Sequence, residues 1–260
     1  MKQWISPREA AEAIKRGRGK GIKIAILDSG VEASHPALGG LELVDDVAIV
    51  EEGQRLKVVP GGVDRFGHGT AIASILRRVA PEAELGSFRV FGESLSTRTA
   101  TIAEGARLAM ERGYHILNCS FGCSIPDHVL HHKRWVDEAY LKGIHIVAAC
   151  NNDDFTRAEW PGFFSSVITV NMARTGDDGQ LFHKPGTLVE FAACGIDVEV
   201  AWCDGLMKKV TGSSFASPHV AGMLACMLSE KPGLWPLQAK TLFHQIARPW
   251  TLDLRAPNDG

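Results

Sequence analysis

The chain has 260 residues, of which 45% are hydrophobic and 22% charged, a balance typical of a globular protein with a sizeable core. Its formal net charge is -2, from 28 Lys and Arg against 30 Asp and Glu, so it lacks the basic excess of a nucleic-acid-binding domain. No apolar run approaches the roughly 20 residues of a membrane-spanning helix, and the N-terminal residues lack the apolar core of a signal peptide. We therefore expect no nucleic-acid or membrane partner and a cytoplasmic location.

The cysteine pattern argues against a metal centre. The six cysteines are Cys119, Cys123, Cys150, Cys194, Cys203 and Cys226. None of them forms a Cys-x-x-Cys pair, so we expect no metal and no cofactor. Cys119, Cys150 and Cys226 lie within apolar runs, where a thiol behaves as a small buried hydrophobe.

Strands and helices are expected to alternate along the chain. Ser6-Pro-Arg-Glu9 has the pattern of a capping box and predicts a helix to about Lys15. Short apolar strands are expected at Ile22–Leu27, Gly86–Val90, His115–Cys119, His145–Ala149 and Val167–Val170. Helical periodicity predicts helices over Arg98–Arg112 and Asp127–Lys142. This order predicts an α/β fold with a mostly parallel central sheet and helices on both faces. We expect one domain over residues 1–260, with an N-terminal extension at 1–20 and a C-terminal tail at 250–260.

Three segments contain residues suited to nucleophilic catalysis. Asp28 ends the first strand and precedes Ser-Gly, His68 stands in Gly-His-Gly-Thr, and Ser214 stands in Gly-Ser-Ser-Phe-Ala-Ser-Pro-His. Each segment taken alone is more often a turn or a helix cap. Together they supply a nucleophile, a base to take its proton, and an acid to orient that base.

The order Asp, His, Ser, with these three motifs, resembles the subtilisin-like serine proteases, the subtilases. The resemblance runs from about residue 21 to residue 247. It implies that Asp28 orients His68, that His68 is general base and then general acid, and that Ser214 is the nucleophile rather than Ser213 or Ser217.

The resemblance also implies an oxyanion hole and two strands that hold an extended substrate by β-augmentation. The segment Val147-Ala-Ala-Cys-Asn151 matches the oxyanion segment, with Asn151 as the donor and Asn152 as the alternative. The residues expected to bind the substrate backbone are Ser120, Phe121 and Gly122 on one strand and Leu95, Ser96 and Thr97 on the other.

One further segment bears on specificity. Glu159-Trp-Pro-Gly162 resembles the base of the family's S1 pocket, where Glu159 would favour a Lys or Arg side chain. The alternative is that a shortened loop leaves Glu159 on the surface. Between the His68 helix and the next strand the chain lacks room for the calcium-binding loop of secreted relatives, which implies little dependence on calcium.

These patterns predict a serine endopeptidase acting on an extended peptide or protein. A catalytically silent subtilase fold serving as a binding module is the alternative, and the intact Asp28, His68 and Ser214 speak against it. A nucleotide-binding protein would need a phosphate loop after its first strand, and the glycine-rich Gly17–Gly21 precedes it instead. General degradation and processing of one precursor both stay open, and the sequence gives no indication of oligomeric state.

Overall fold

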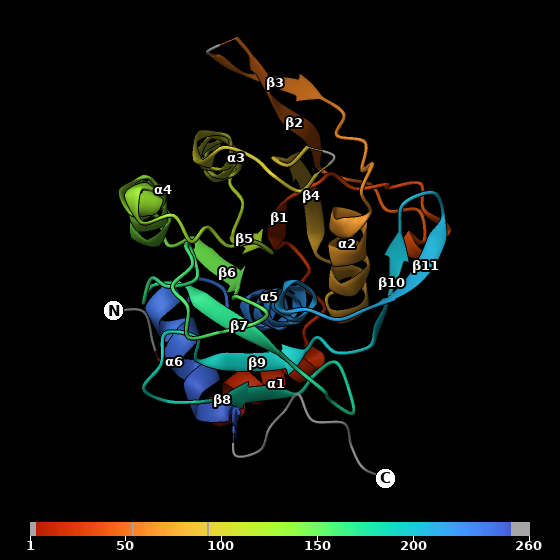
Figure 1. The fold of residues 1–260 in the computed structure, drawn as a ribbon. Coiled ribbons are helices and arrows are strands. Elements are labelled where there is room, and N and C mark those ends of the chain that lie inside the picture. The colour runs from red at the N-terminus through yellow and green to blue at the C-terminus, as the bar shows by residue number, and fades with distance from the viewer. Residues whose placement is uncertain (1–3, 54, 93, 251–260) are drawn as a thin grey trace.

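The computed structural model describes residues 4–53, 55–92 and 94–250, and a ten-stranded sheet runs through its centre (Figure 1). The strand order is β12-β8-β9-β7-β6-β5-β1-β4-β2-β3. These strands are β1 (Lys23–Asp28), β2 (Asp45–Glu52), β3 (Arg55–Pro60), β4 (Glu84–Arg89), β5 (Ile116–Cys119), β6 (His145–Ala149), β7 (Ile168–Ala173), β8 (Leu181–His183), β9 (Phe191–Cys194) and β12 (Arg248–Pro249). The seven strands from β9 to β2 are parallel to one another, whereas β3 and β8 pair antiparallel with their neighbours β2 and β9. A separate antiparallel pair consists of β10 (Val198–Trp202) and β11 (Leu206–Val210).

Helices cover both faces of the sheet. One face carries α1 (Pro7–Arg16), α2 (His68–Val79), α5 (Ser213–Glu230) and α6 (Pro236–Ile246), and the other carries α3 (Thr99–Glu111) and α4 (Val129–Leu141). Two short 3-10 helices are η1 (Pro36–Leu38) and η2 (Pro126–His128). Strand β1 shows why two cores form, because successive side chains of a strand point to opposite faces. Ile24 and Ile26 belong to the core under α2 and α5, and Ala25 and Leu27 to the core under α3 and α4.

The predicted α/β class and its mostly parallel sheet are confirmed. Within α1 the capping box is present, with the Ser6 hydroxyl accepting from the Glu9 backbone and the Glu9 carboxylate accepting from the Ser6 N–H. The predicted helix 127–142 begins instead as η2 and continues as α4. Most of the proposed tail, residues 251–260, lies outside the described residues. The β2–β3 hairpin, which projects from the body in Figure 1, was not predicted.

The topology brings functional segments to one edge of the sheet. Strands β1, β5 and β6 are parallel neighbours, so the residues that follow them meet at their carboxyl ends. Helices α2 and α5 pack side by side and begin at the same edge, with His68 and Ser214 in their first turns. Across the described part of the chain, no helix is both long enough and apolar enough to cross a bilayer.

Candidate active site

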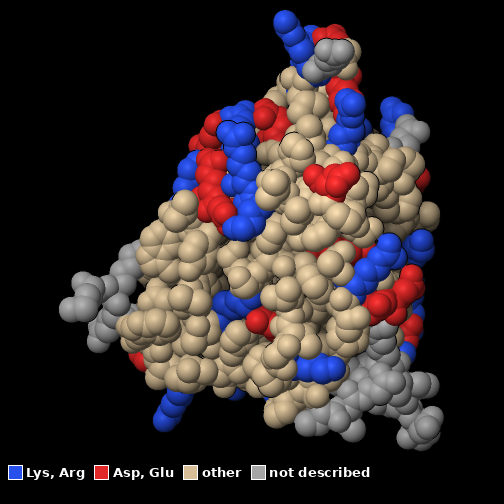
Figure 2. Space-filling view, turned by 60° about the vertical axis from the view of Figure 1, so that its left-hand side comes forward, with Lys and Arg blue, Asp and Glu red and all other residues tan. Residues whose placement is uncertain are grey.

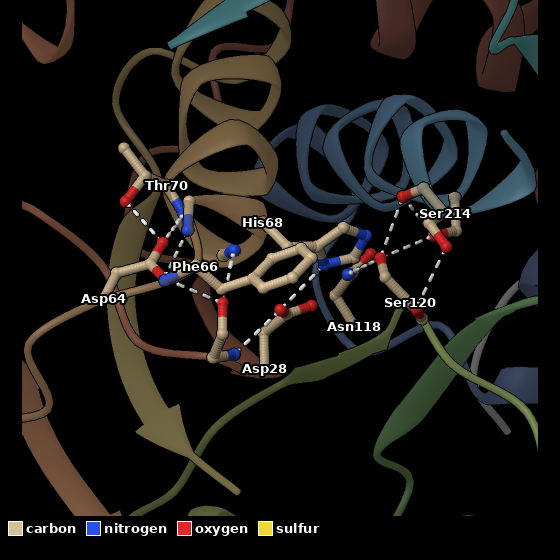
Figure 3. Close-up of polar contacts among 12 residues, drawn as sticks. Asp28, Asp64, Phe66, His68, Thr70, Asn118, Ser120 and Ser214 are labelled. Carbon is tan, nitrogen blue, oxygen red and sulfur yellow. Dashed lines mark hydrogen bonds and ion pairs between the residues drawn. The ribbon is translucent and has the colours of Figure 1, made fainter. Parts of the chain in front are cut away.

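Asp28, His68 and Ser214 come together at this edge. The Oδ1 atom of Asp28 lies 2.8 Å from Nδ1 of His68, and both side chains are buried. In Figure 3 the imidazole of His68 lies between the Asp28 carboxylate and the Ser214 side chain. Because Nδ1–H faces a carboxylate, Nε2 is left with the lone pair that a general base needs.

The charge environment of His68 favours its protonated form. Burial alone would lower the pKa of His68, but the Asp28 carboxylate opposes this by charge and by hydrogen bonding, and Asp64 adds a weaker attraction. The net result is a pKa raised above its ordinary value. An imidazolium formed during proton transfer is therefore stabilised at this position.

Asp64 fixes the turn that presents His68. Its Oδ1 accepts hydrogen bonds from the Ser29 hydroxyl at 2.9 Å and from the Gly67 N–H at 2.7 Å. Its Oδ2 accepts from both the N–H and the hydroxyl of Thr70, at 2.9 and 2.7 Å. The same Ser29 hydroxyl accepts from the Gly69 N–H at 3.0 Å, so the Asp28 and His68 segments are joined on both sides of the pair (Figure 3).

Two glycines in these motifs allow the backbones to approach closely. A Cβ on Gly69 would lie 2.0 Å from the carbonyl oxygen of Gly30. A Cβ on Gly30, which has a φ of 109°, would lie 2.1 Å from the carbonyl oxygen of Gly62. A side chain at Gly69 would push the His68 helix away from the Asp28 segment, and one at Gly30 would push that segment away from the loop at Gly62.

Ser214 is the serine of its motif that faces open space. Its hydroxyl donates to the Ser120 carbonyl at 3.1 Å, and the residue is half-buried and lines the groove described below. Ser213 is fully buried and donates to the Cys150 carbonyl at 2.6 Å. Ser217 is also fully buried, 3.0 Å from the Ser120 hydroxyl. Neither competitor can reach a substrate.

The two candidate oxyanion asparagines have different partners. The Oδ1 atom of Asn152 accepts from the Ser213 N–H at 2.8 Å, which places this carboxamide beside the first turn of α5. Asn151 instead donates from Nδ2 to Glu159 Oε1 at 2.8 Å, and its Oδ1 accepts from the N–H groups of Asp153 and Asp154. Asn151 stays the sequence-based prediction for the oxyanion donor, and the contact of Asn152 with α5 supports the alternative.

A groove of about 480 Å³ passes the Ser214 hydroxyl. Both segments expected to bind substrate line it, together with His68 and Ser214: Leu95, Ser96 and Thr97 on one side and Ser120, Phe121 and Gly122 on the other. Ser120 also fixes the groove to α5, because its hydroxyl accepts from Asn118 Nδ2 and donates to the Ser214 carbonyl, both at 2.9 Å. Asn118 begins an Asn-x-Ser sequon, but it is fully buried and cannot serve as a glycosylation site.

Glu159 is half-buried next to Gly122 rather than free on the surface. A Cβ on Gly122 would lie 2.4 Å from Glu159 Oε2, so only glycine leaves room for this carboxylate. Among the described residues, no Lys or Arg forms an ion pair with Glu159. The prediction that Cys119, Cys150 and Cys226 are buried is confirmed.

A buried Asp–His pair beside an accessible serine, on a parallel α/β sheet, defines a serine hydrolase of the acyl-enzyme type. The model of the subtilase family of peptidases matches residues 19–256. The chain therefore belongs to the subtilase family of serine endopeptidases.

Characterised relatives and solved structures agree with this membership. The chain is 29% identical to Subtilisin Savinase of Lederbergia lenta over 241 residues, covering 88% of this chain and 84% of that protein. It is 29% identical to M-protease of Shouchella clausii, covering 88% of this chain but only 60% of that protein. A cold-adapted subtilisin-like serine proteinase superposes with a TM-score of 0.73 at 26% identity, over 88% of this chain and 83% of that one. The S41 psychrophilic protease superposes with a TM-score of 0.76 at 26% identity, over 92% of this chain and 91% of that one.

Proposed function

We propose that this chain hydrolyses peptide bonds of an extended peptide or protein segment, with Asp28, His68 and Ser214 as its catalytic triad. The observation that carries the proposal is the buried 2.8 Å contact between Asp28 and His68, next to a serine that lines a groove. His68 Nε2 takes the proton of the Ser214 hydroxyl as Oγ attacks the carbonyl carbon of the substrate. It then gives that proton to the leaving amine, and a water molecule releases the acyl group by the same steps in reverse.

In this proposal Asn152 supplies the oxyanion hole together with the backbone N–H of Ser214. Its Oδ1 contact with the Ser213 N–H orients the carboxamide and leaves Nδ2 free to donate. The Ser214 N–H lies in the first turn of α5, where amide groups have no helical carbonyl partner. Donors placed in this way stabilise charge that develops only in the transition state.

The substrate backbone is proposed to lie between Leu95–Thr97 and Ser120–Gly122. Both segments line one groove with the nucleophile, which supports their pairing with an extended chain. Glu159 lies just beyond Gly122 and has no cationic partner among the described residues, so a Lys or Arg side chain of the substrate is its natural counter-charge.

The competing function is a catalytically inactive subtilase fold that serves as a binding module. Labelling with a fluorophosphonate distinguishes this module from a working peptidase. A working acyl-enzyme site reacts covalently through Ser214, and mapping of the modified peptide identifies that residue. The Ser214→Ala variant should fold normally, lose labelling and lose nearly all peptidase activity. Full activity in the folded variant would refute the triad, and absence of labelling in the unaltered protein would favour the binding module.

Two wider features belong to the same proposal. We propose a reducing, cytoplasmic compartment, supported by Cys119 and Cys226, whose thiols are buried in the apolar core. We also propose a single domain, since one sheet draws its strands from residues 23 to 249. On the face shown in Figure 2, acidic and basic side chains are interspersed, and no broad basic patch of the kind that binds nucleic acid is visible.

A further inference from the structure

Three potential metal ligands from separate segments meet beside helix α5. Asp178 precedes β8, Cys194 ends β9 and His219 lies within α5. One ligand atom from each lies within 4.8 Å of the other two, and this is the one such group of three among the residues the structure describes. His219 is fully buried, whereas Asp178 and Cys194 are partly exposed.

The orientation of His219 leaves its second ring nitrogen facing a carboxylate, a thiol and the Arg78 guanidinium. Its Nδ1 lies 2.8 Å from the carbonyl oxygen of Phe215, so Nδ1 carries a hydrogen and donates it. Its Nε2 lies 3.2 Å from Asp178 Oδ1, and the Cys194 sulfur completes the group. A nitrogen lone pair next to a carboxylate oxygen calls for a positive group beside them, and either a metal ion or the Arg78 guanidinium, whose Nη2 lies 3.4 Å from Nε2, can supply it. A carbonyl that holds the far nitrogen of a ligating histidine is the usual second partner in metal sites.

Arg78 now supplies positive charge to this cluster. It pairs with Asp178 Oδ2, its Nη2 lies 3.4 Å from His219 Nε2, and its Nη1 donates to the Glu199 carbonyl. The Arg78 side chain is 41% exposed, so it can move outward into solvent when a cation takes its place. Asp178 also borders a cavity between α1, α5 and the turn before β8, which provides a path of entry.

We propose that Asp178, Cys194 and His219 form a binding site for a thiophilic divalent cation of the zinc type, which displaces Arg78. A set of one sulfur, one imidazole nitrogen and one carboxylate oxygen suits Zn²⁺, whereas Ca²⁺ and Mg²⁺ prefer oxygen ligands alone. Binding converts the Cys194 thiol to a thiolate and releases its proton to solvent. Since His219 follows Ser214 by five residues in α5, the ion would tie the active-site helix to β9 and the turn at Asp178.

Cobalt provides a direct test, because Co²⁺ occupies zinc sites and absorbs in the near ultraviolet when a thiolate binds it. Titration of the full chain with CoCl₂ should produce a saturating charge-transfer band that excess ZnCl₂ abolishes. The band should disappear in Cys194→Ser and remain in Cys203→Ser, a matched change at another partly exposed thiol. In Asp178→Asn the titration midpoint should move to higher cobalt concentration.

The Arg78→Gln variant tests whether a bound cation displaces the Arg78 guanidinium. Removal of the guanidinium should lower the cobalt midpoint, because a cation no longer has to replace an existing positive charge. ZnCl₂ should also raise the melting temperature of the unaltered protein by mass action, and not that of Cys194→Ser. Absence of a band, or a band that persists in Cys194→Ser, would overturn the site, and an unchanged midpoint in Arg78→Gln would overturn the displacement. These readouts do not involve peptidase activity, so they stand apart from the proposed function.

Discussion

The carboxamide oxygen of Asn152 accepts a 2.8 Å hydrogen bond from the backbone N–H of Ser213, the residue just before the proposed nucleophile. This contact ties the segment after β6 to the first turn of α5. It also fixes which end of the carboxamide remains free. An oxyanion donor needs this kind of rigid support, since its contribution depends on being in place before charge develops.

Replacement of Asn152 by Ala should therefore lower kcat by roughly 10²–10³ with little change in KM. That magnitude is the one known for the oxyanion asparagine of subtilisin itself and is carried over to this relative. Steady-state kinetics on one peptide substrate measure it, with Asn151→Ala as the matched control. The assignment fails if Asn151→Ala loses kcat by this factor while Asn152→Ala retains it.

The sequence predicted the triad and left the oxyanion donor open between two adjacent residues, Asn151 and Asn152. Three motifs identify Asp28, His68 and Ser214, because each combines a reactive residue with glycines or small residues that the close approach of two backbones requires. Asn151 and Asn152 are adjacent and chemically identical, and their side chains leave the chain in different directions. Only the three-dimensional path after β6 separates them. The Asp178, Cys194 and His219 cluster could not be predicted either, since its members come from three distant segments with no ligand spacing.

Glu159→Gln should reduce kcat/KM for substrates with Lys or Arg at P1 by about 10–100-fold, because a charge-assisted hydrogen bond contributes about 1.5–3 kcal/mol. Cleavage after Phe or Leu should change little or improve. A peptide library varied at P1 measures both. Asp153→Asn, an exposed acid six residues earlier, is the control. Equal preference for basic and apolar P1 residues in the unaltered protein would exclude Glu159 from specificity.

The acid limb of the pH profile should report on His68. Burial lowers the pKa of His68, but Asp28 and, more weakly, Asp64 together raise it above its ordinary value. Because the base must be neutral, kcat/KM should fall as the pH drops through a value above the ordinary pKa of about 6.5. Asp64→Asn removes one of the attracting charges, so its acid limb should move to lower pH. Glu138→Gln on α4 serves as the control, and a limb unmoved by Asp64→Asn would show that Asp64 acts through structure alone.

Calcium should have little effect on thermal stability. Helix α2 ends at Val79 and β4 begins at Glu84, so only four residues join the elements between which the family resemblance implies a calcium loop in secreted relatives. A cation that binds only the native state raises the melting temperature by mass action, and without a site there is no shift. Protein freed of metal with a chelator and then given CaCl₂ should melt as before. A rise of many degrees on CaCl₂ would reveal a calcium site elsewhere.

Acid should destabilise the fold in part through His132, which lies within α4. This side chain is fully buried, neither ring nitrogen has a hydrogen-bond partner, and Trp135 packs against the ring at 6.1 Å between centroids. Burial, together with the nearby His128 and His131, lowers the pKa of His132 to about 4. The unfolded chain should titrate near 6.5, so between these values it binds more protons than the folded chain, and stability falls as the pH drops.

The expected loss from His132 is about 2–3 kcal/mol between pH 7 and pH 4.5. Urea unfolding across this range in the unaltered protein and in His132→Leu measures it, because Leu is similar in size and does not titrate. The variant should lose less stability on acidification. Arg134→Gln, at an exposed position two residues later on α4, should keep the original pH dependence. His145 is buried in β6, and burial lowers its pKa to about 4 as well. It contributes the same loss of stability on acidification in every variant, so the difference in stability between His132→Leu and the unaltered protein does not depend on it. Parallel curves for the unaltered protein and His132→Leu would mean that His132 titrates alike in the folded and unfolded chain.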